Sequence, residues 1–133
     1  MPSLEELFIA AKAVQTRAYA PYSKFKVGAA IATPDGRIFT GCNVENAAYP
    51  VGTCAEAGAI SAMLAGGERR IDAIVVLGGG DSLCTPCGGC RQRIREFAAS
   101  DTPVHVAGPE GIRKSFTLDE LLPYSFGPDN LSA

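Results

Sequence analysis

The chain carries five cysteines, and three of them lie in one short stretch, Cys84-Thr-Pro-Cys87-Gly-Gly-Cys90. The number is odd, and residues 1–6 contain two acids and no basic residue, so we expect no secretory signal. In a reducing cytoplasm, clustered cysteines more often bind metal or do chemistry than form disulfides. We therefore expect a cytoplasmic protein whose cysteines build a metal or catalytic site.

Two predicted helices begin at cysteines. Residues 53–56, Thr-Cys-Ala-Glu, have the form of a capping box, and a later helix should begin within residues 86–90. Helix amino termini carry partial positive charge and free N–H groups, which favour thiolates. If both helices begin at one edge of a sheet, Cys54, Cys87 and Cys90 supply three ligands of a tetrahedral zinc site whose fourth position is open for catalysis.

The cysteine run has other interpretations. A Cys-x-x-Cys pair also occurs in structural zinc sites and in redox motifs, but the thioredoxin-like context of the latter is not evident. With Cys84, the run reads C-x2-C-x2-C, as in iron–sulfur proteins. The ferredoxin pattern then requires a cysteine at position 94, where this chain has Ile94. We expect Cys84 to be an ordinary small packing residue.

Glu56 has a structural and a chemical interpretation. A glutamate at the third helical position of a capping box needs no catalytic role. However, Cys-Ala-Glu at the start of one helix and Pro-Cys-x-x-Cys at the start of another form the three-cysteine version of the zinc deaminase signature. In that signature the glutamate is the general acid/base and not a ligand. The joint pattern favours the catalytic role for Glu56.

Composition limits the remaining possibilities. The 133 residues suit one domain, residues 1–133, and 47% apolar with 20% charged residues excludes disorder as the main state. A net charge of −2 offers no basic excess for nucleic acid. No apolar run approaches the roughly 18 residues that cross a bilayer. We expect neither nucleic acid nor membrane as a partner.

The order of elements predicts an α/β fold, a three-layer α-β-α sandwich around a mixed five-stranded sheet. The lone histidine, His105, is expected at the surface or edge of a strand. The first half of the chain predicts a helix opened by a capping box at 3–6 and ending before Pro21, a strand with one buried face at 25–31, an antiparallel strand at 37–43, and a helix from Cys54 to about Leu64. The second half predicts a fully buried central strand at 71–77, a helix beginning within 86–90, strands near 104–106 and 113–116, and a short helix at 118–122.

Five segments of the chain, 22–30, 40–49, 54–56, 86–92 and 121–126, share one further property. Together and in this order they resemble the small cytidine deaminases of the homotetrameric type, and the likeness covers nearly the whole chain. The resemblance implies a cytidine deaminase-like fold and a hydrolase acting on the C–N bond of a cyclic amidine. It would convert cytidine and deoxycytidine to uridine and deoxyuridine with release of ammonia, in pyrimidine salvage, as a homotetramer whose sites neighbouring subunits complete.

The resemblance also implies roles for individual residues. Glu56 is the proton shuttle, and one Zn²⁺ per chain is held by the three cysteines. Phe126 reaches from the carboxyl-terminal segment into the site of a neighbouring subunit. The remaining implied residues are the ligands Cys54, Cys87 and Cys90, the nucleoside-binding residues Phe25, Asn43, Val44 and Glu45, and Ala55, whose backbone contacts the base.

One departure from the family pattern concerns charge. Many relatives carry arginine directly after Cys-Ala-Glu, where this chain has Ala57. Three thiolates around Zn²⁺ leave a net charge of −1, which an arginine donating to sulfur offsets. We expect Arg91, next to Cys90, to make that contact. Alternative functions are deamination of a blasticidin-type nucleoside or a free pyrimidine base, which Glu45 disfavours, and a non-catalytic zinc or iron–sulfur module.

Overall fold

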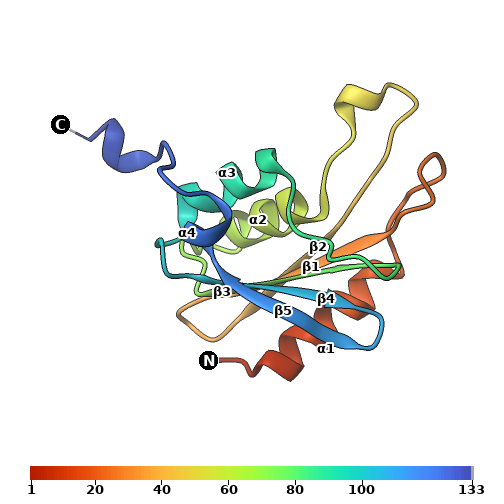
Figure 1. Ribbon diagram of the computed structural model, residues 1–133, viewed down its shortest axis with the longest axis horizontal. Coiled ribbons are helices and arrows are strands. Elements are labelled where there is room, and N and C mark those ends of the chain that lie inside the picture. Colours follow the sequence, from red (N-terminus) through yellow and green to blue (C-terminus); the bar gives the residue numbers. More distant parts are fainter. Residues whose placement is uncertain (133) are drawn as a thin grey trace.

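The computed structural model describes residues 1–132 and contains a mixed five-stranded sheet with the order β2-β1-β3-β4-β5 (Figure 1). β1 runs antiparallel to β2 and β3, β4 runs parallel to β3, and β5 is antiparallel to β4. The predicted mixed sheet is therefore confirmed. The strands are β1 (Val27–Ala32), β2 (Ile38–Cys42), β3 (Ala73–Gly78), β4 (Pro103–Gly108) and β5 (Gly111–Thr117).

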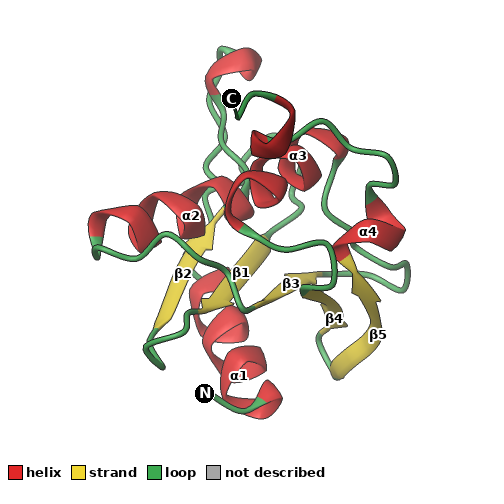
Figure 2. Ribbon diagram, turned by 90° about the vertical axis from the view of Figure 1, so that its left-hand side faces the viewer, coloured by secondary structure: helices red, strands yellow, loops and turns green. Residues whose placement is uncertain are grey.

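Helices cover both faces of the sheet, which confirms the three-layer sandwich. Figure 2 shows α1 (Leu4–Gln15) on one side and α2 (Ala55–Ala65) with α3 (Gly88–Phe97) on the other. The short helix α4 (Leu118–Leu121) packs against α3 and β5. The predicted capping box of Ser3 and Glu6 opens α1. No helix within residues 1–132 has the length and apolar character to cross a bilayer.

β1 differs from its prediction. The sequence suggested one buried face over 25–31, but the strand begins at Val27 and is buried on both faces. Ala29 and Ile31 belong to the core beneath α2, while Ala30 and Ala32 belong to the core beneath α1. The misleading alternation came from lysines in the preceding loop, whereas the positions inside the sheet hold residues small enough to lie beneath a helix.

The topology brings the starts of α2 and α3 to one edge of the sheet. β2 and β3 are both antiparallel to β1, so they point in the same direction. Their last residues, Cys42 and Gly78, lie opposite neighbouring residues at the amino end of β1, Gly28 and Val27 respectively. After β2 the chain forms a short 3-10 helix, Tyr49–Val51, and then α2, whose N-cap is Cys54. After β3 it forms α3, whose N-cap is Cys87.

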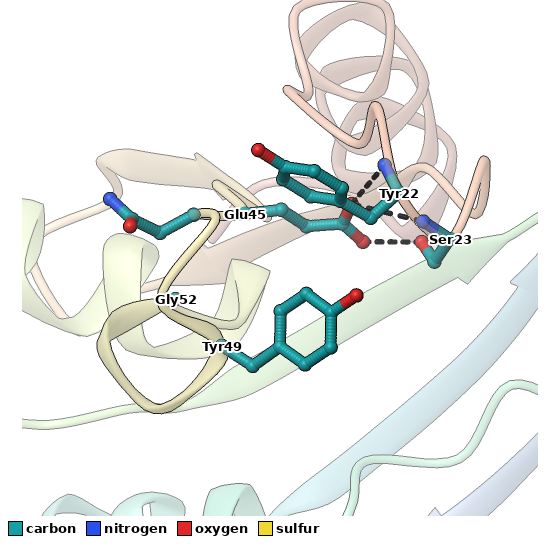
Figure 3. Close-up of a pocket in the computed structure, with 6 residues that line it drawn as sticks. Tyr22, Ser23, Glu45, Tyr49 and Gly52 are labelled. Atoms are coloured by element: carbon teal, nitrogen blue, oxygen red, sulfur yellow. Dashed lines mark hydrogen bonds between the residues drawn. The ribbon is translucent and has the colours of Figure 1, made fainter.

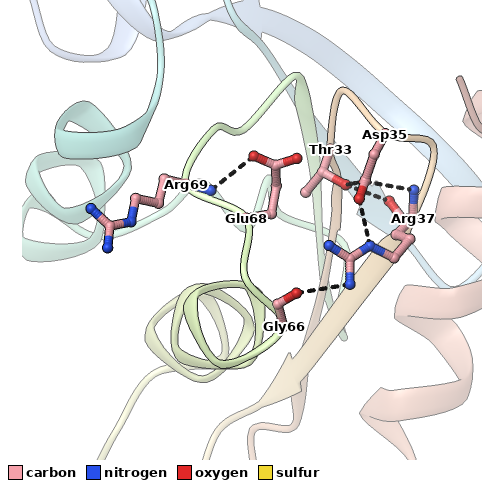
Figure 4. A network of polar contacts seen from close by, with 6 residues as sticks. All are labelled: Thr33, Asp35, Arg37, Gly66, Glu68 and Arg69. Carbon is pink, nitrogen blue, oxygen red and sulfur yellow. Dashed lines mark hydrogen bonds and ion pairs between the residues drawn. The ribbon is translucent and has the colours of Figure 1, made fainter.

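A polar network ties the other end of α2 to the β1–β2 turn (Figure 4). The Asp35 carboxylate accepts hydrogen bonds from Thr33 Oγ1 and from Arg37 Nε, the latter at 2.7 Å. Arg37 Nη1 then donates to the carbonyl of Gly66, just beyond the end of α2, at 2.9 Å. This contact helps to fix α2 from the end opposite to its cysteine.

Candidate active site

Cys54 and Cys87 occupy the same position on two helices. Each is the N-cap, with extended backbone and no capping hydrogen bond from its side chain. The predicted capping box at 53–56 is therefore wrong, because the cap falls one residue later and a thiol is a poor hydrogen-bond acceptor. Glu56 consequently lies at the second helical position, so the structural explanation for its presence no longer applies.

The sulfur atoms of Cys54, Cys87 and Cys90 lie within 4.8 Å of one another. Tetrahedral zinc–thiolate bonds of about 2.3 Å separate the sulfurs by about 3.8 Å, so the donor set fits zinc. Cys84 does not belong to this cluster. It packs against the core beneath α2, and burial raises the pKa of its thiol to about 11. This is the packing role expected for it.

The three thiols differ in their surroundings. The backbone N–H of Cys90 stabilises the Cys87 thiolate and lowers its pKa, as expected near a helix amino terminus. Burial raises the pKa of Cys54 and of Cys90. The cluster thus combines one exposed thiol that ionises readily with two less exposed thiols for which a bound cation offsets the cost of ionisation.

Glu56 is buried beside this cluster, with 4% of its surface exposed. Burial raises the pKa of its carboxyl group, while the Cys90 side chain and the Arg93 guanidinium act in the opposite direction. No lysine or arginine in the described residues forms an ion pair with it. A carboxyl group with a raised pKa next to a metal-ligand set is suited to accept and return a proton near neutral pH.

A hollow of about 390 Å³ lies between the loop before β1 and the loop after β2 (Figure 3). The rings of Tyr22 and Tyr49 meet edge to face at its rim, with their centroids 5.8 Å apart. Glu45 lies between the loops, and its Oε1 accepts hydrogen bonds from the backbone N–H groups of Tyr22 and Ser23 at 2.9 and 3.1 Å. The Ser23 hydroxyl also donates to Oε2 and is the main cause of a lowered pKa of Glu45.

Asn43 and Phe25 are linked through the backbone. Asn43 Oδ1 accepts from the N–H of Val27, and Nδ2 donates to the carbonyl of Phe25, both at 2.8 Å. The Phe25 ring reaches the carboxyl end of β3, where a Cβ on Gly78 would lie 3.0 Å from its Cζ. Asn43 therefore holds the backbone next to Phe25. This places the Phe25 ring at the sheet edge where β3 ends and the chain continues toward α3.

The other predicted nucleoside-binding residues occupy different surroundings. Val44 is exposed in the loop with Glu45, and Ala55 is fully buried in the first turn of α2. Phe126 lies on the carboxyl-terminal segment, which extends away from the three layers (Figure 1). It is 57% exposed and does not line the hollow that contains Glu45. Its own chain does not bring Phe126 to that hollow.

The expected sulfur contact of Arg91 is wrong. Its guanidinium donates instead to the carbonyls of Pro86 and Leu121, each at 2.7 Å. The donor to sulfur is Arg93, whose Nη1 lies 3.6 Å from Cys90 Sγ. Residues three apart share a helix face and residues one apart do not, so the i, i+3 spacing was a signal that could have identified Arg93.

Known proteins with similar sequences belong to a family with a zinc-binding region, in agreement with the cysteine cluster. Residues 1–106 match the family described as the cytidine and deoxycytidylate deaminase zinc-binding region. The cytidine deaminase of Sporosarcina psychrophila is 40% identical over 129 residues, covering 97% of this chain and 95% of that protein. That of Mycobacterium tuberculosis is 39% identical over 134 residues, covering 98% and 96%.

A solved structure is also similar. The 1.6 Å crystal structure of cytidine deaminase from Burkholderia pseudomallei superposes with a TM-score of 0.88 at 42% identity, covering 94% of this chain and all of that one. The fold, the cysteine cluster and the sequence similarity therefore point to the same family. The chain belongs to the cytidine and deoxycytidylate deaminase family.

Proposed function

We propose that the protein is a zinc-dependent hydrolase that converts cytidine and deoxycytidine to uridine and deoxyuridine with release of ammonia. The observation that carries this proposal is the buried Glu56 beside three cysteine sulfurs that meet at the starts of two helices. Relatives named cytidine deaminase, about 40% identical over nearly the whole chain, support it.

Each residue of this centre has a defined task. Cys54, Cys87 and Cys90 hold the zinc ion, which when bound lowers the pKa of a coordinated water to about 7 and so supplies a nucleophile at neutral pH. The Glu56 carboxylate takes a proton from the attacking water and delivers it to ring N3. The water oxygen bonds to C4, and the same carboxylate then takes the remaining proton of that oxygen and passes it to the amino nitrogen. The C4–N bond breaks, C4 keeps the oxygen as a carbonyl, and ammonia leaves. A positioned acid/base of this kind contributes roughly 10²–10⁴-fold to the rate.

The loops around the hollow orient the nucleoside. Glu45 and Asn43 face the ribose hydroxyls, and Phe25 packs on the pyrimidine ring, with Val44 beside them and the Ala55 backbone on the base. Because three donors already hold the Glu45 carboxylate, it is oriented and ionised before substrate arrives. A carboxylate acceptor for ribose hydroxyls favours a nucleoside over a free pyrimidine base.

The proposal extends to assembly and setting. Residues 1–133 form one domain that assembles as a homotetramer, in which Phe126 reaches the site of a neighbouring subunit. Exposed side chains such as Tyr22, Phe25 and Tyr49 offer apolar surface that further copies can cover. The enzyme works in the cytoplasm in pyrimidine salvage, without nucleic acid or membrane as a partner.

The first experiment measures zinc content and the absorbance change on cytidine in the same preparations. The wild-type chain should contain one zinc and deaminate cytidine, while Cys54→Ala, Cys87→Ala and Cys90→Ala should lose both properties. Cys84→Ala is the matched control and should keep both, because its sulfur lies outside the cluster.

The same measurements separate the alternatives. Iron in place of zinc would indicate an iron–sulfur module, and zinc without turnover of any nucleoside would indicate a non-catalytic one. Turnover of a blasticidin-type nucleoside but not of cytidine would move the proposal to that substrate.

A further inference from the structure

One positively charged side chain lies on the cysteine cluster, and it comes from α3. Arg93 Nη1 donates to Cys90 Sγ at 3.6 Å. The same nitrogen would lie 3.3 Å from a Cβ on Gly89, and that Cβ would lie 4.0 Å from Cys87 Sγ. The guanidinium therefore reaches back over the first turn of α3, and the absence of a side chain at Gly89 leaves room for it beside Cys90 Sγ.

α2 supplies no cation to the same place. Residues 54–66 contain no lysine or arginine, and Glu56 adds a negative group. Ala57, the residue after Cys-Ala-Glu, lines a hollow of about 360 Å³ between α2 and α3 together with Arg93. The small side chain of Ala57 on α2 thus leaves this hollow open, and Arg93 borders it from α3.

The other two arginines of α3 are bound elsewhere. Arg91 donates to the carbonyls of Pro86 and Leu121. Arg95 donates to Ser125 Oγ at 3.0 Å and pairs with Asp129 at 3.4 Å, so it holds the carboxyl-terminal segment. Among the arginines of α3, only Arg93 contacts a ligand sulfur.

The charge at the centre gives this contact its importance. Three thiolates and one Zn²⁺ carry a net charge of −1, and the Glu56 carboxylate adds to it when ionised. A guanidinium keeps its charge at every working pH, and hydrogen bonds from a charged donor to an anion are about twice as strong as neutral ones. Groups that donate to metal ligands typically change metal affinity by about 10- to 100-fold.

We propose that Arg93 is a positioning residue that orients and neutralises the Cys90 thiolate from α3, and so sets how tightly the centre retains zinc. The inference rests on the proposed zinc-dependent function. Arg93 is exposed on its outer side, so its truncation removes the sulfur contact without opening the core.

The test is competition for zinc between the purified holoenzyme and a chromophoric chelator. We expect Arg93→Ala to weaken zinc retention by about 10- to 100-fold. Arg93→Lys keeps the charge but loses the planar fork, so it should lie between wild type and Arg93→Ala. Arg95→Ala removes the same charge two residues along the same helix without touching sulfur, so its zinc retention should match wild type.

Thermal unfolding of each zinc-loaded variant controls for general destabilisation. Wild-type zinc retention by Arg93→Ala would overturn the inference, as would equal losses in Arg93→Ala and Arg95→Ala. A wild-type chain that binds no zinc would instead overturn the proposed function, so the two failures are distinguishable.

Discussion

The two ends of the candidate site are built differently. At the metal end, Ala55, Glu56 and Cys90 are buried in the first turns of two helices that rest on the sheet. At the pocket end, Tyr22 lies in the loop before β1 and Tyr49 begins a short 3-10 helix, Tyr49–Val51, and the two are 49% and 74% exposed. The proposed catalytic groups are thus set in regular structure, and the groups around the proposed nucleoside pocket lie on surface segments.

The polar groups follow the same division. Glu56 is buried and forms no ion pair in the part of the chain that the structure describes. Burial therefore raises the pKa of its carboxyl group. Glu45 is held by three donors from its neighbouring loop, so its charge is stabilised. One carboxyl group is thus suited to exchange protons and the other to accept hydrogen bonds. Three substitutions test this division.

The largest effect is expected at the metal end. Glu56→Gln keeps the size of the side chain but removes its ability to exchange protons. We expect kcat to fall by roughly 10²–10⁴-fold, with zinc content and folding retained. Steady-state kinetics with metal analysis checks this, and near-normal turnover would refute the role of Glu56 as proton shuttle.

The next effect is expected at Glu45. Glu45→Gln removes the charged acceptor, so KM for cytidine should rise by roughly tenfold or more with little change in kcat. Ser23→Ala removes one donor and leaves two backbone N–H groups on the carboxylate, so KM should rise less than in Glu45→Gln. A fall in kcat at unchanged KM would place Glu45 in the chemical step and erase the division.

The smallest effect is expected at the carboxyl-terminal segment. Phe126→Ala should raise KM by about threefold to tenfold and leave zinc content unchanged, because an aromatic contact with substrate is lost in a neighbouring subunit. Leu131→Ala, which shortens another exposed apolar side chain of the same segment, should leave KM unchanged. A fully active monomer in size-exclusion chromatography would contradict the shared site.

Local patterns in the sequence were sufficient for the main features of the fold. The capping box at Ser3 and the nearly continuous apolar run that became β3 each act through neighbouring residues, so their structural consequences are largely local. The cysteine spacing similarly placed Cys87 and Cys90 on one helix, because Cys90 lies within one turn of Cys87.

Other features depended on packing between distant segments. β1 is buried on both faces because α1 covers one side of the sheet and α2 covers the other. Asn43 and Glu45 gained their partners only when the loops before β1 and after β2 met. The identity of the sulfur donor also depended on packing. Arg91 donates to the carbonyls of Pro86 and Leu121, whereas Arg93 lies on the helix face that carries Cys90 and donates to its sulfur. The three cysteines of the proposed zinc site and the two helices that bear them follow from residue types and spacing. Their surroundings do not, because burial and long-range hydrogen bonds arise only when separate elements pack together.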